Sequence, residues 1–175
     1  RNIEGLPSSA TLLRADMRDE GVLDRAVAGQ SVIFNLAGLG CHRDSMASPL
    51  TDLEMNVRAH ALLLEACRRL NPGARIVYAS TRQIYGRPRQ LPVTESHPAS
   101  PVDVNGIHKL AAEQYHLLYH CVHGLRACAL RLTNVMGPGM RIRDARQVFY
   151  GAWVRSLIEG RPFQVWGGAQ LRDII

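Results

Sequence analysis

Short apolar runs of strand length alternate along this chain with longer segments whose apolar residues recur at helical spacing. Residues 31–37, 74–80 and 125–132 form the clearest runs, and residues 51–70 and 102–122 form the clearest helical patterns. Continuous apolar strands joined by helices are typical of a parallel sheet. Because crossovers between parallel strands are right-handed, we expect an α/β fold: a Rossmann-like, doubly wound parallel sheet with helices on both faces.

Weaker patterns extend this strand–helix alternation toward both ends of the chain. Each is a short apolar run or a helical pattern of the same kind as the clearer ones. We expect a strand over residues 10–16, a helix over 19–27, a helix over about 144–159 and a strand over 163–166.

The two long helical segments have recognisable ends and faces. Asn71-Pro72-Gly73 should stop the first helix, and Gly124 should stop the second. The second helix carries an apolar face made of Ile107, Leu110, Ala111, Tyr115, Leu118 and Val122.

Composition and charge exclude several classes of protein. The 175 residues are 46% apolar, which suits one folded domain, and no apolar stretch approaches the length of a membrane span. The first residues lack the apolar core of a secretory signal, so we expect a cytoplasmic protein without a membrane partner. The net charge is +6, but the 20 arginines are spread along the chain, which argues against a nucleic-acid partner. The single lysine is Lys109.

The cysteines and histidines predict neither a disulfide framework nor a metal site. The four cysteines form no CxxC pair, so we expect buried, reduced thiols. His116 and His120 are four residues apart and would share a helix face, which is one possible metal geometry. No carboxylate or second histidine pair completes such a site, and we therefore expect no metal.

Candidate functional residues lie at the carboxyl ends of the expected strands, where parallel sheets bind their ligands. Thr81 follows the strand over 74–80, so its hydroxyl should face the ligand crevice. Lys109 lies on the next helix, and Asn105 is one i,i+4 step before it on the same face. A strand-end hydroxyl opposite a lysine is an arrangement that oxidoreductases use, because the lysine holds a ribose and the hydroxyl binds a substrate oxygen.

With these residues in place, the chain resembles the extended short-chain dehydrogenase/reductases, specifically the NAD-dependent epimerase/dehydratase family that acts on nucleotide sugars. The resemblance covers essentially the whole chain in order and spacing, although each motif alone is weak. The matching segments are Asp16-Met-Arg-Asp19, Asn35-Leu-Ala-Gly38, Asn56-Val57, Val77-Tyr-Ala-Ser-Thr81, Ile84-Tyr85-Gly86, Leu130-Arg-Leu-Thr-Asn134, Gly137-Pro138 and Gln170-Leu-Arg-Asp173.

The resemblance implies a cofactor, a substrate class and a set of site residues. The cofactor is NAD, with NADP left open, and the substrate is a nucleotide sugar. Thr81, Asn105 and Lys109 take the catalytic positions, and a homodimer through helices 51–70 and 102–122 is expected. The implied cofactor-binding residues are Asp16, Met17, Leu36, Ala37, Gly38, Asn56, Ala79, Ser80 and Lys109, and the implied substrate-binding residues are Tyr85, Asn134 and Arg172.

The chain departs from the family pattern at its start. The family's Gly-rich phosphate loop, on the first strand–helix turn, is absent. We therefore expect an internal fragment that lacks the first βαβ unit and most of the C-terminal substrate lobe. On this view, residues 1–175 form one partial NAD(P)-binding domain, and a substrate-binding region begins near residues 140–175.

A second departure concerns the chemistry. The family's tyrosine, four residues before the lysine, is Asn105 here, and an amide cannot relay a proton. Either another group such as Tyr85, His108 or water carries the proton, or the protein binds a sugar nucleotide or dinucleotide without turnover. After Thr81, family dehydratases carry an Asp-Glu pair where this chain has Arg82-Gln83. We therefore expect epimerase chemistry, in which a ring carbon is transiently oxidised and then reduced again.

Overall fold

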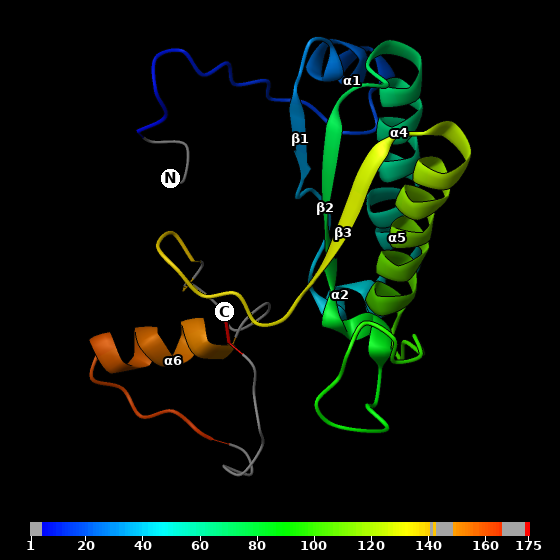
Figure 1. Ribbon diagram of the computed structural model, residues 1–175. Coiled ribbons are helices and arrows are strands. Elements are labelled where there is room, and N and C mark those ends of the chain that lie inside the picture. The colour runs from blue at the N-terminus through cyan, green and yellow to red at the C-terminus, as the bar shows by residue number, and fades with distance from the viewer. Residues whose placement is uncertain (1–4, 141, 143–148, 166–173) are drawn as a thin grey trace. The chain divides into compact units, whose positions relative to one another are not determined.

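The computed structural model describes residues 5–140, 142, 149–165 and 174–175 (Figure 1). The chain forms two compact units. Met17–Thr133 is the larger unit, and the described residues of Arg1–Asp16 and Asn134–Ile175 form the smaller one. No helix of the described residues is long and apolar enough to cross a membrane.

The larger unit is built on a parallel sheet of three strands in the order β1-β2-β3. Its strands are β1 (Val32–Asn35), β2 (Arg75–Thr81) and β3 (Arg126–Leu132), and in register Arg75 pairs with both Val32 and Arg126. Each strand corresponds to one of the three clearest apolar runs. The predicted Rossmann-like parallel α/β fold is therefore confirmed.

The helices follow the predicted periodicity with shifted boundaries. The segment predicted over 51–70 is three consecutive helical stretches, the middle one a π-helical turn. The short helix α2 was not predicted. The helical elements are α1 (Glu20–Val27), α2 (His42–Ala47), α3 (Pro49–Leu53), the π-helical turn η1 (Glu54–Arg58), α4 (Ala59–Leu70), the 3₁₀ turn η2 (Arg82–Tyr85) and α5 (Val104–His123).

Side-chain and backbone caps fix the helix ends. Asp19 accepts a hydrogen bond from the Val22 N–H at the start of α1, and Asp103 accepts one from the Gly106 N–H at the start of α5. Gly124 ends α5 in the left-handed conformation with φ of 72°, as its position in the sequence predicted. Asn71 ends α4 and donates to the carbonyls of Val27 and Gln30, which ties α4 to the end of α1.

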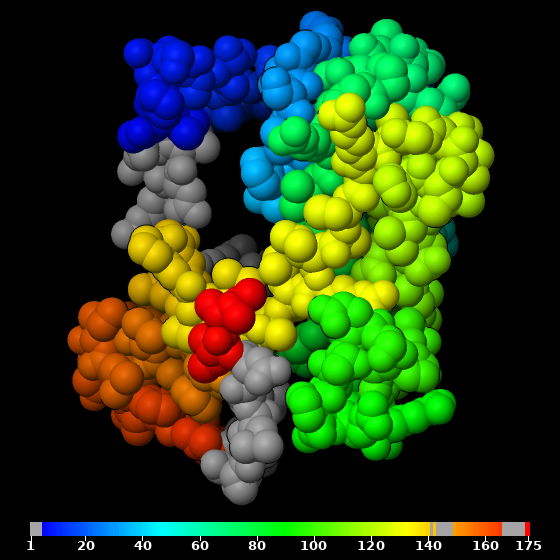
Figure 2. Space-filling model, viewed as in Figure 1, coloured from blue at the N-terminus to red at the C-terminus, as the bar shows by residue number. Residues whose placement is uncertain are grey.

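The apolar core lies between the sheet and helices α1 and α4. Along β2 every second side chain is buried, beginning with Ile76, and this face of the sheet carries the helices (Figure 1). The other face of β1 and β3 is open, since Phe34 is 66% exposed and Leu130 is 47% exposed (Figure 2). Helices on the second face are not found among the described residues. The core consists of Leu23, Val27, Leu63, Leu64, Ala66, Cys67, Ile76 and Leu125.

Helix α5 packs on the sheet through a largely polar face. Its buried residues are Asn105, Gly106, Ala112, Glu113 and His116. In the apolar stripe seen in the sequence, Ile107, Leu118 and Val122 are instead half or more exposed, and none of its six residues is buried. The buried face is polar because Glu113 and His116 find hydrogen-bonding partners on the sheet, in Ser80 and Asn35.

In the smaller unit, an aromatic group surrounds helix α6 (Phe149–Ile158). Trp153 contacts the ring of Phe149 and stacks on Phe163 at a centroid distance of 5.4 Å. A single bridge pairs Asn134 with Ile174. The helix predicted over 144–159 is confirmed where it can be compared, from residue 149 to 158, because residues 144–148 lie outside the described part.

Two predicted strands are wrong. Residues 10–16 and 163–165 have no strand conformation, and Trp166 lies outside the described residues. A strand is defined by hydrogen bonds to a neighbouring strand, and neither segment pairs with one within the described ranges. An apolar run alone therefore overpredicted strand structure at both places.

A histidine pair is buried between the sheet and the helices. The Asn35 amide donates to His60 Nδ1 at 2.8 Å and to His116 Nε2 at 3.1 Å, and His116 Nδ1 donates to the Ala112 carbonyl. Burial, with the nearby Lys109 charge, lowers the pKa of His60 from 6.5 to about 3. Burial also lowers the pKa of His116. Both rings are therefore neutral in the native state at neutral pH.

Acidification is expected to destabilise the larger unit before its carboxylates titrate. Below pH 6.5 the unfolded chain binds a proton at His60, whereas the folded chain does not. The free energy of unfolding therefore falls as pH falls from 6.5 toward 3. At pH 5 the loss is about 2 kcal/mol from His60 alone. Urea unfolding at pH 7, 6 and 5 measures this slope. His60→Gln should flatten it, whereas the exposed His123→Gln should not, and an unchanged free energy of unfolding between pH 7 and 5 would contradict the prediction.

Candidate functional site

Two asparagines hold the loop that follows β1. Asn56, in η1, accepts from the Leu39 N–H at 3.0 Å and donates to the Leu39 carbonyl at 2.9 Å. Asn105, in the first turn of α5, donates to the same carbonyl at 2.7 Å. Both asparagines are almost fully buried. One backbone group of the loop is thus fixed by side chains from two different helical elements.

Gly38 brings the loop backbone against these side chains. Its φ of 134° favours glycine, and a Cβ atom there would lie 2.4 Å from Asn56 Oδ1. The same Cβ would lie 3.5 Å from Lys109 Nζ, so the lysine reaches this loop from α5. The sequence placed Gly38, Asn56 and Lys109 in the cofactor site, and the structure brings the three together.

Lys109 connects α5 to the carboxyl end of β2. Its Nζ donates to the Ala79 carbonyl at 3.1 Å and lies 5.1 Å from the centre of the Tyr78 ring. Burial lowers the pKa of the lysine, while the Asp52 carboxylate opposes that shift. Burial raises the pKa of the Tyr78 phenol, so this buried tyrosine stays neutral.

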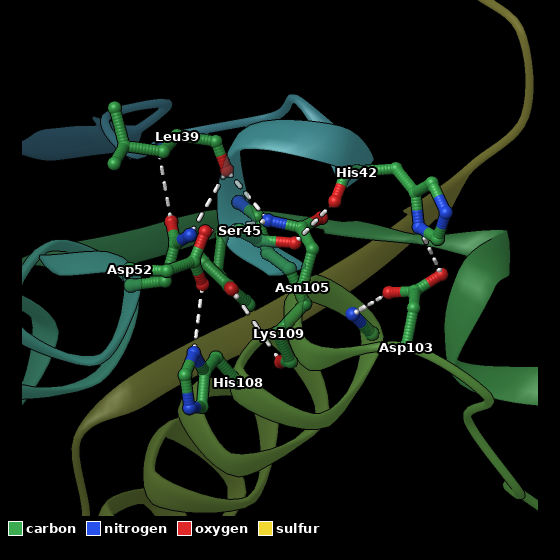
Figure 3. Close-up of polar contacts among 11 residues, drawn as sticks. Leu39, His42, Ser45, Asp52, Asp103, Asn105, His108 and Lys109 are labelled. Atoms are coloured by element: carbon green, nitrogen blue, oxygen red, sulfur yellow. Dashed lines mark hydrogen bonds and ion pairs between the residues drawn. The ribbon is translucent and has the colours of Figure 1, made fainter. Parts of the chain in front are cut away.

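Asp52, in α3, is a buried carboxylate between Asn105 and His108. Its Oδ2 accepts from the Asn105 amide at 3.3 Å, and its Oδ1 lies 2.7 Å from His108 Nδ1. Asp52 is 1% exposed. At the other side of the same cluster, Asp103 pairs with His42 of α2 at 3.1 Å (Figure 3). These contacts join α2 and α3 to the first two turns of α5.

Thr81 and Ser80 end β2 in different environments. Thr81 is half-buried, and its hydroxyl accepts from the Gln83 N–H, which starts the η2 turn. Ser80 is buried and donates to Glu113 at 2.5 Å. Glu113 also accepts from Arg131 at 2.7 Å, and this bond raises the pKa of the arginine.

Tyr85 lies away from solvent beside Arg131. The arginine donates to the Tyr85 hydroxyl at 2.8 Å, and its guanidinium lies 5.0 Å from the centre of the tyrosine ring. His97 packs edge-on against the same ring. This environment gives Tyr85 a structural partner on each side, and its hydroxyl accepts a charge-assisted hydrogen bond.

The other predicted site residues are distributed over the chain. Leu36 and Ala37 are exposed in the loop after β1, and Met17 packs against the apolar core. Asp16 and Asn134 belong to the smaller unit, where the Asn134 carbonyl accepts from the Ile175 N–H at 3.1 Å. Arg172 lies outside the described residues. His116 and His120 bond separately to backbone carbonyls, and the described residues hold no group of three metal-ligating side chains.

Sequence reasoning missed Asp52 and Leu39. Asp52 is four residues before Asn56, so a helical pattern of buried polar residues could have indicated it. Leu39 contributes only its backbone, which leaves no side-chain signal. The neighbouring pair of His42 and Asp103 was missed because the two residues are far apart in the sequence.

Comparisons with known proteins found a matching family and similar structures. A family model described as "NAD dependent epimerase/dehydratase family" matches residues 1–175. UDP-glucose 4-epimerase of Azospirillum brasilense is 32% identical over 187 residues, covering 98% of this chain and 53% of that protein. UDP-N-acetylglucosamine 4-epimerase from Methanobrevibacter ruminantium M1 has a TM-score of 0.88 at 27% identity, covering 94% of this chain and 53% of that one.

A third similar structure contains both a nucleotide sugar and NAD. UDP-glucuronic acid 4-epimerase from Bacillus cereus, in complex with UDP-glucuronic acid and NAD, has a TM-score of 0.85 at 25% identity, covering 99% of this chain and 54% of that one. The chain spans about half the length of the curated relatives it matches. A match over all 175 residues, together with this fold and site, shows that the chain belongs to the NAD-dependent epimerase/dehydratase family.

Proposed function

We propose that this protein is an NAD-dependent nucleotide-sugar epimerase. The observation that supports this most is the convergence of Lys109, Gly38 and Asn56 at the carboxyl ends of β1 and β2. This is the edge of a parallel sheet where dinucleotides bind. Relatives named UDP-glucose 4-epimerase and UDP-glucuronic acid 4-epimerase supply the substrate class for the proposal.

The residues of the larger unit fit a bound dinucleotide. Gly38 leaves room for close approach to the loop backbone, and Lys109 is held where it can donate to a ribose hydroxyl. Leu36, Ala37, Ala79 and Ser80 lie at or after the same strand ends. When bound, NAD supplies the hydride acceptor and donor that epimerisation requires. Asp16 and Met17 are proposed to complete the site near the adenine, and NADP is left open.

Residues of the chain itself are proposed to bind the sugar, and a proton acceptor is needed for its oxidation. Thr81 is proposed to position the reacting sugar hydroxyl, and Tyr85, Asn134 and Arg172 to bind the substrate. Oxidation of a ring hydroxyl to a carbonyl transfers the carbon-bound hydrogen as hydride and releases the hydroxyl proton. Asn105 cannot take that proton because an amide has no suitable pKa. The Tyr85 hydroxyl is engaged with Arg131, whereas His108 bonds to Asp52 through Nδ1 alone, so His108 Nε2 or water is the proposed proton acceptor.

Epimerisation is favoured over dehydration by the residues after Thr81. Elimination of water needs an acid and a base near the sugar, whereas Arg82 and Gln83 occupy the turn that follows the strand. The Thr81 hydroxyl accepts from the Gln83 N–H and so caps the start of this turn. No carboxylate is available within η2.

A second candidate function is a sugar-nucleotide or dinucleotide-binding module without turnover. The observation that favours it is the buried Asn105 at the position of the usual tyrosine, with its amide engaged by Leu39 and Asp52. Binding requires the loop and Lys109, but it does not require a proton acceptor. The two candidates therefore differ in turnover and agree in ligand binding.

Location and domain organisation complete the proposal. All four cysteines are free thiols, which agrees with a reducing, cytoplasmic location. Cys41 and Cys67 are buried as expected, whereas the expectation of burial is wrong for Cys121 and Cys128, which are exposed. We further propose that residues 1–175 are one partial cofactor-binding domain and that a substrate-binding region begins near residues 140–175.

The partner is proposed to be a second copy of this chain, bound through α5 and the helices over 51–70. Ile107, Leu118 and Val122 are 52%, 53% and 64% exposed and lie on one face of α5. Large apolar side chains aligned on an exposed helix face are typical of an interface. Leu50 in α3, which is 76% exposed, adds to the apolar surface offered by this group of helices.

One prediction about the proposed function separates the two candidate functions. Incubation of the full-length protein with UDP- and dTDP-hexoses should yield the 4-epimer of one of them, detected by NMR of the product mixture. Asn105→Tyr should raise the rate, because a phenol near Lys109 can exchange a proton. Binding without product in both proteins favours the binding module.

A second prediction concerns the loop at Gly38. Gly38→Ala should destabilise the protein more than Gly29→Ala, although both glycines have positive φ, because no atom lies near a Cβ at Gly29. We expect about 1 kcal/mol for Gly29→Ala and about 3 kcal/mol for Gly38→Ala. Urea unfolding measures both, and NAD titration should show weakened binding for Gly38→Ala alone. Equal effects would contradict the proposed close approach.

A third prediction tests the dimer. Val122→Glu places a charge in the exposed apolar stripe and should shift the full-length protein toward monomer in analytical ultracentrifugation. Gln30→Glu, which adds the same charge at an exposed site before β1, is the matched control and should leave the mass unchanged. A wild-type protein that sediments as a monomer at micromolar concentration contradicts the proposal.

A further inference from the structure

The side-chain amide of Asn105 lies between two groups that can only accept hydrogen bonds. Its Nδ2 donates to the Leu39 carbonyl at 2.7 Å and to Asp52 Oδ2 at 3.3 Å. An amide nitrogen carries two hydrogens, and these two bonds use both. A flipped amide would place its oxygen against a carbonyl and a carboxylate, so the neighbours determine the orientation.

The remaining atom, Asn105 Oδ1, has no donor among the described residues. The enclosed side-chain atoms without a partner in that part of the chain are Asn35 Oδ1, His60 Nε2 and Thr133 Oγ1. Asn105 Oδ1 is not one of them, although the residue as a whole is 1% exposed. Oδ1 is therefore the one polar atom of this side chain that keeps some solvent contact.

Asp52 is itself held in place. His108 Nδ1 contacts Asp52 Oδ1 at 2.7 Å, which leaves Oδ2 for Asn105. The carboxylate is 1% exposed, and it approaches Asn105 from α3 while the Leu39 carbonyl comes from the loop after β1 (Figure 3). A buried carboxylate with fixed partners holds the amide more firmly than solvent would.

We propose that Asn105 is a fixed, acceptor-only contact for a hydroxyl group of the ligand, and that Asp52 is the positioning residue that sets this polarity. The inference rests on the proposed nucleotide-sugar function, and the group recognised is a sugar hydroxyl that donates to Asn105 Oδ1. If the sugar has a carbonyl group at this position, its oxygen has no hydrogen to donate, and its lone pairs face those of Asn105 Oδ1. The site therefore favours the alcohol form of the sugar over its oxidised form.

A purely structural role for these residues makes a different prediction. If Asn105 and Asp52 only tie α3 and the loop to α5, their removal lowers stability and leaves the preference among ligands unchanged. Recognition of a hydroxyl is tested by replacing that hydroxyl with fluorine, which is similar in size but has no hydrogen to donate.

The experiment measures the dissociation constants of the full-length protein for UDP-glucose and UDP-galactose by titration calorimetry. Their 2-, 3- and 4-deoxyfluoro analogues are titrated in parallel. One analogue should bind about 5- to 10-fold more weakly than its parent, as expected for one lost hydrogen bond. In Asn105→Ala the parent and that analogue should bind equally. Asn71→Ala is the matched control, since Asn71 also donates to two backbone carbonyls but lies at the end of α4.

The positioning role is tested by Asp52→Asn, which keeps the shape but removes the charge. The discrimination between parent and analogue should shrink, whereas Asp24→Asn, at an exposed ion pair with Arg69, should preserve it. Because Asp52→Asn is nearly isosteric, it should fold, and it provides a second test of the inference if Asn105→Ala fails to fold. Thermal melts report folding for each variant.

The outcomes separate this inference from the proposed function. If the wild-type protein binds the parent sugars but discriminates against none of the analogues, or if Asn105→Ala retains the discrimination, the inference is overturned and the proposed function stands. If no nucleotide sugar binds to the wild-type protein, the proposed function fails, and the inference fails with it.

Discussion

The arrangement of the larger unit depends on hydrogen bonds between α5 and the sheet. Helix α5 turns a polar face inward, so its contact with β2 is stabilised by paired groups such as Ser80 with Glu113 and Lys109 with the Ala79 carbonyl. Buried polar groups cost free energy unless every one is satisfied, and such pairing tolerates few alternative registers. The hydrogen bonds therefore restrict the position of the helix along its axis more than apolar packing alone would.

This constraint also explains where the chemistry lies. Asn105 and Lys109 occupy the first turns of the same polar face, so the bonds that position α5 also position the site. The loop after β1 is held against them through Leu39, whose carbonyl is bound by two asparagines. Packing and site geometry thus share one set of contacts, and the apolar stripe of α5 lies on the outer side of the helix.

The sequence predicted the fold well where apolar periodicity alone determines structure. The three strands and the long helices follow from apolar runs, and Gly124 ends α5 as glycine chemistry requires. Prediction failed at residues 10–16, because strand formation depends on a neighbour that an apolar run does not reveal. The site residues on strand ends and on α5 could be located, but the role of Asp52 could not. Its contacts with Asn105 and His108 depend on how α3 packs, which local sequence does not encode.

The π-helical turn Glu54–Arg58 has a consequence for the spacing of the buried polar residues around it. In a regular α-helix, residues four apart drift sideways around the axis at every step, because a turn takes 3.6 residues. A wider π turn drifts in the opposite direction, so one such turn compensates for a neighbouring α turn. Asp52, Asn56 and His60, each four residues from the next, are all at most 1% exposed. The wide turn thereby keeps one carboxylate, one amide and one imidazole on one buried face of this helical segment.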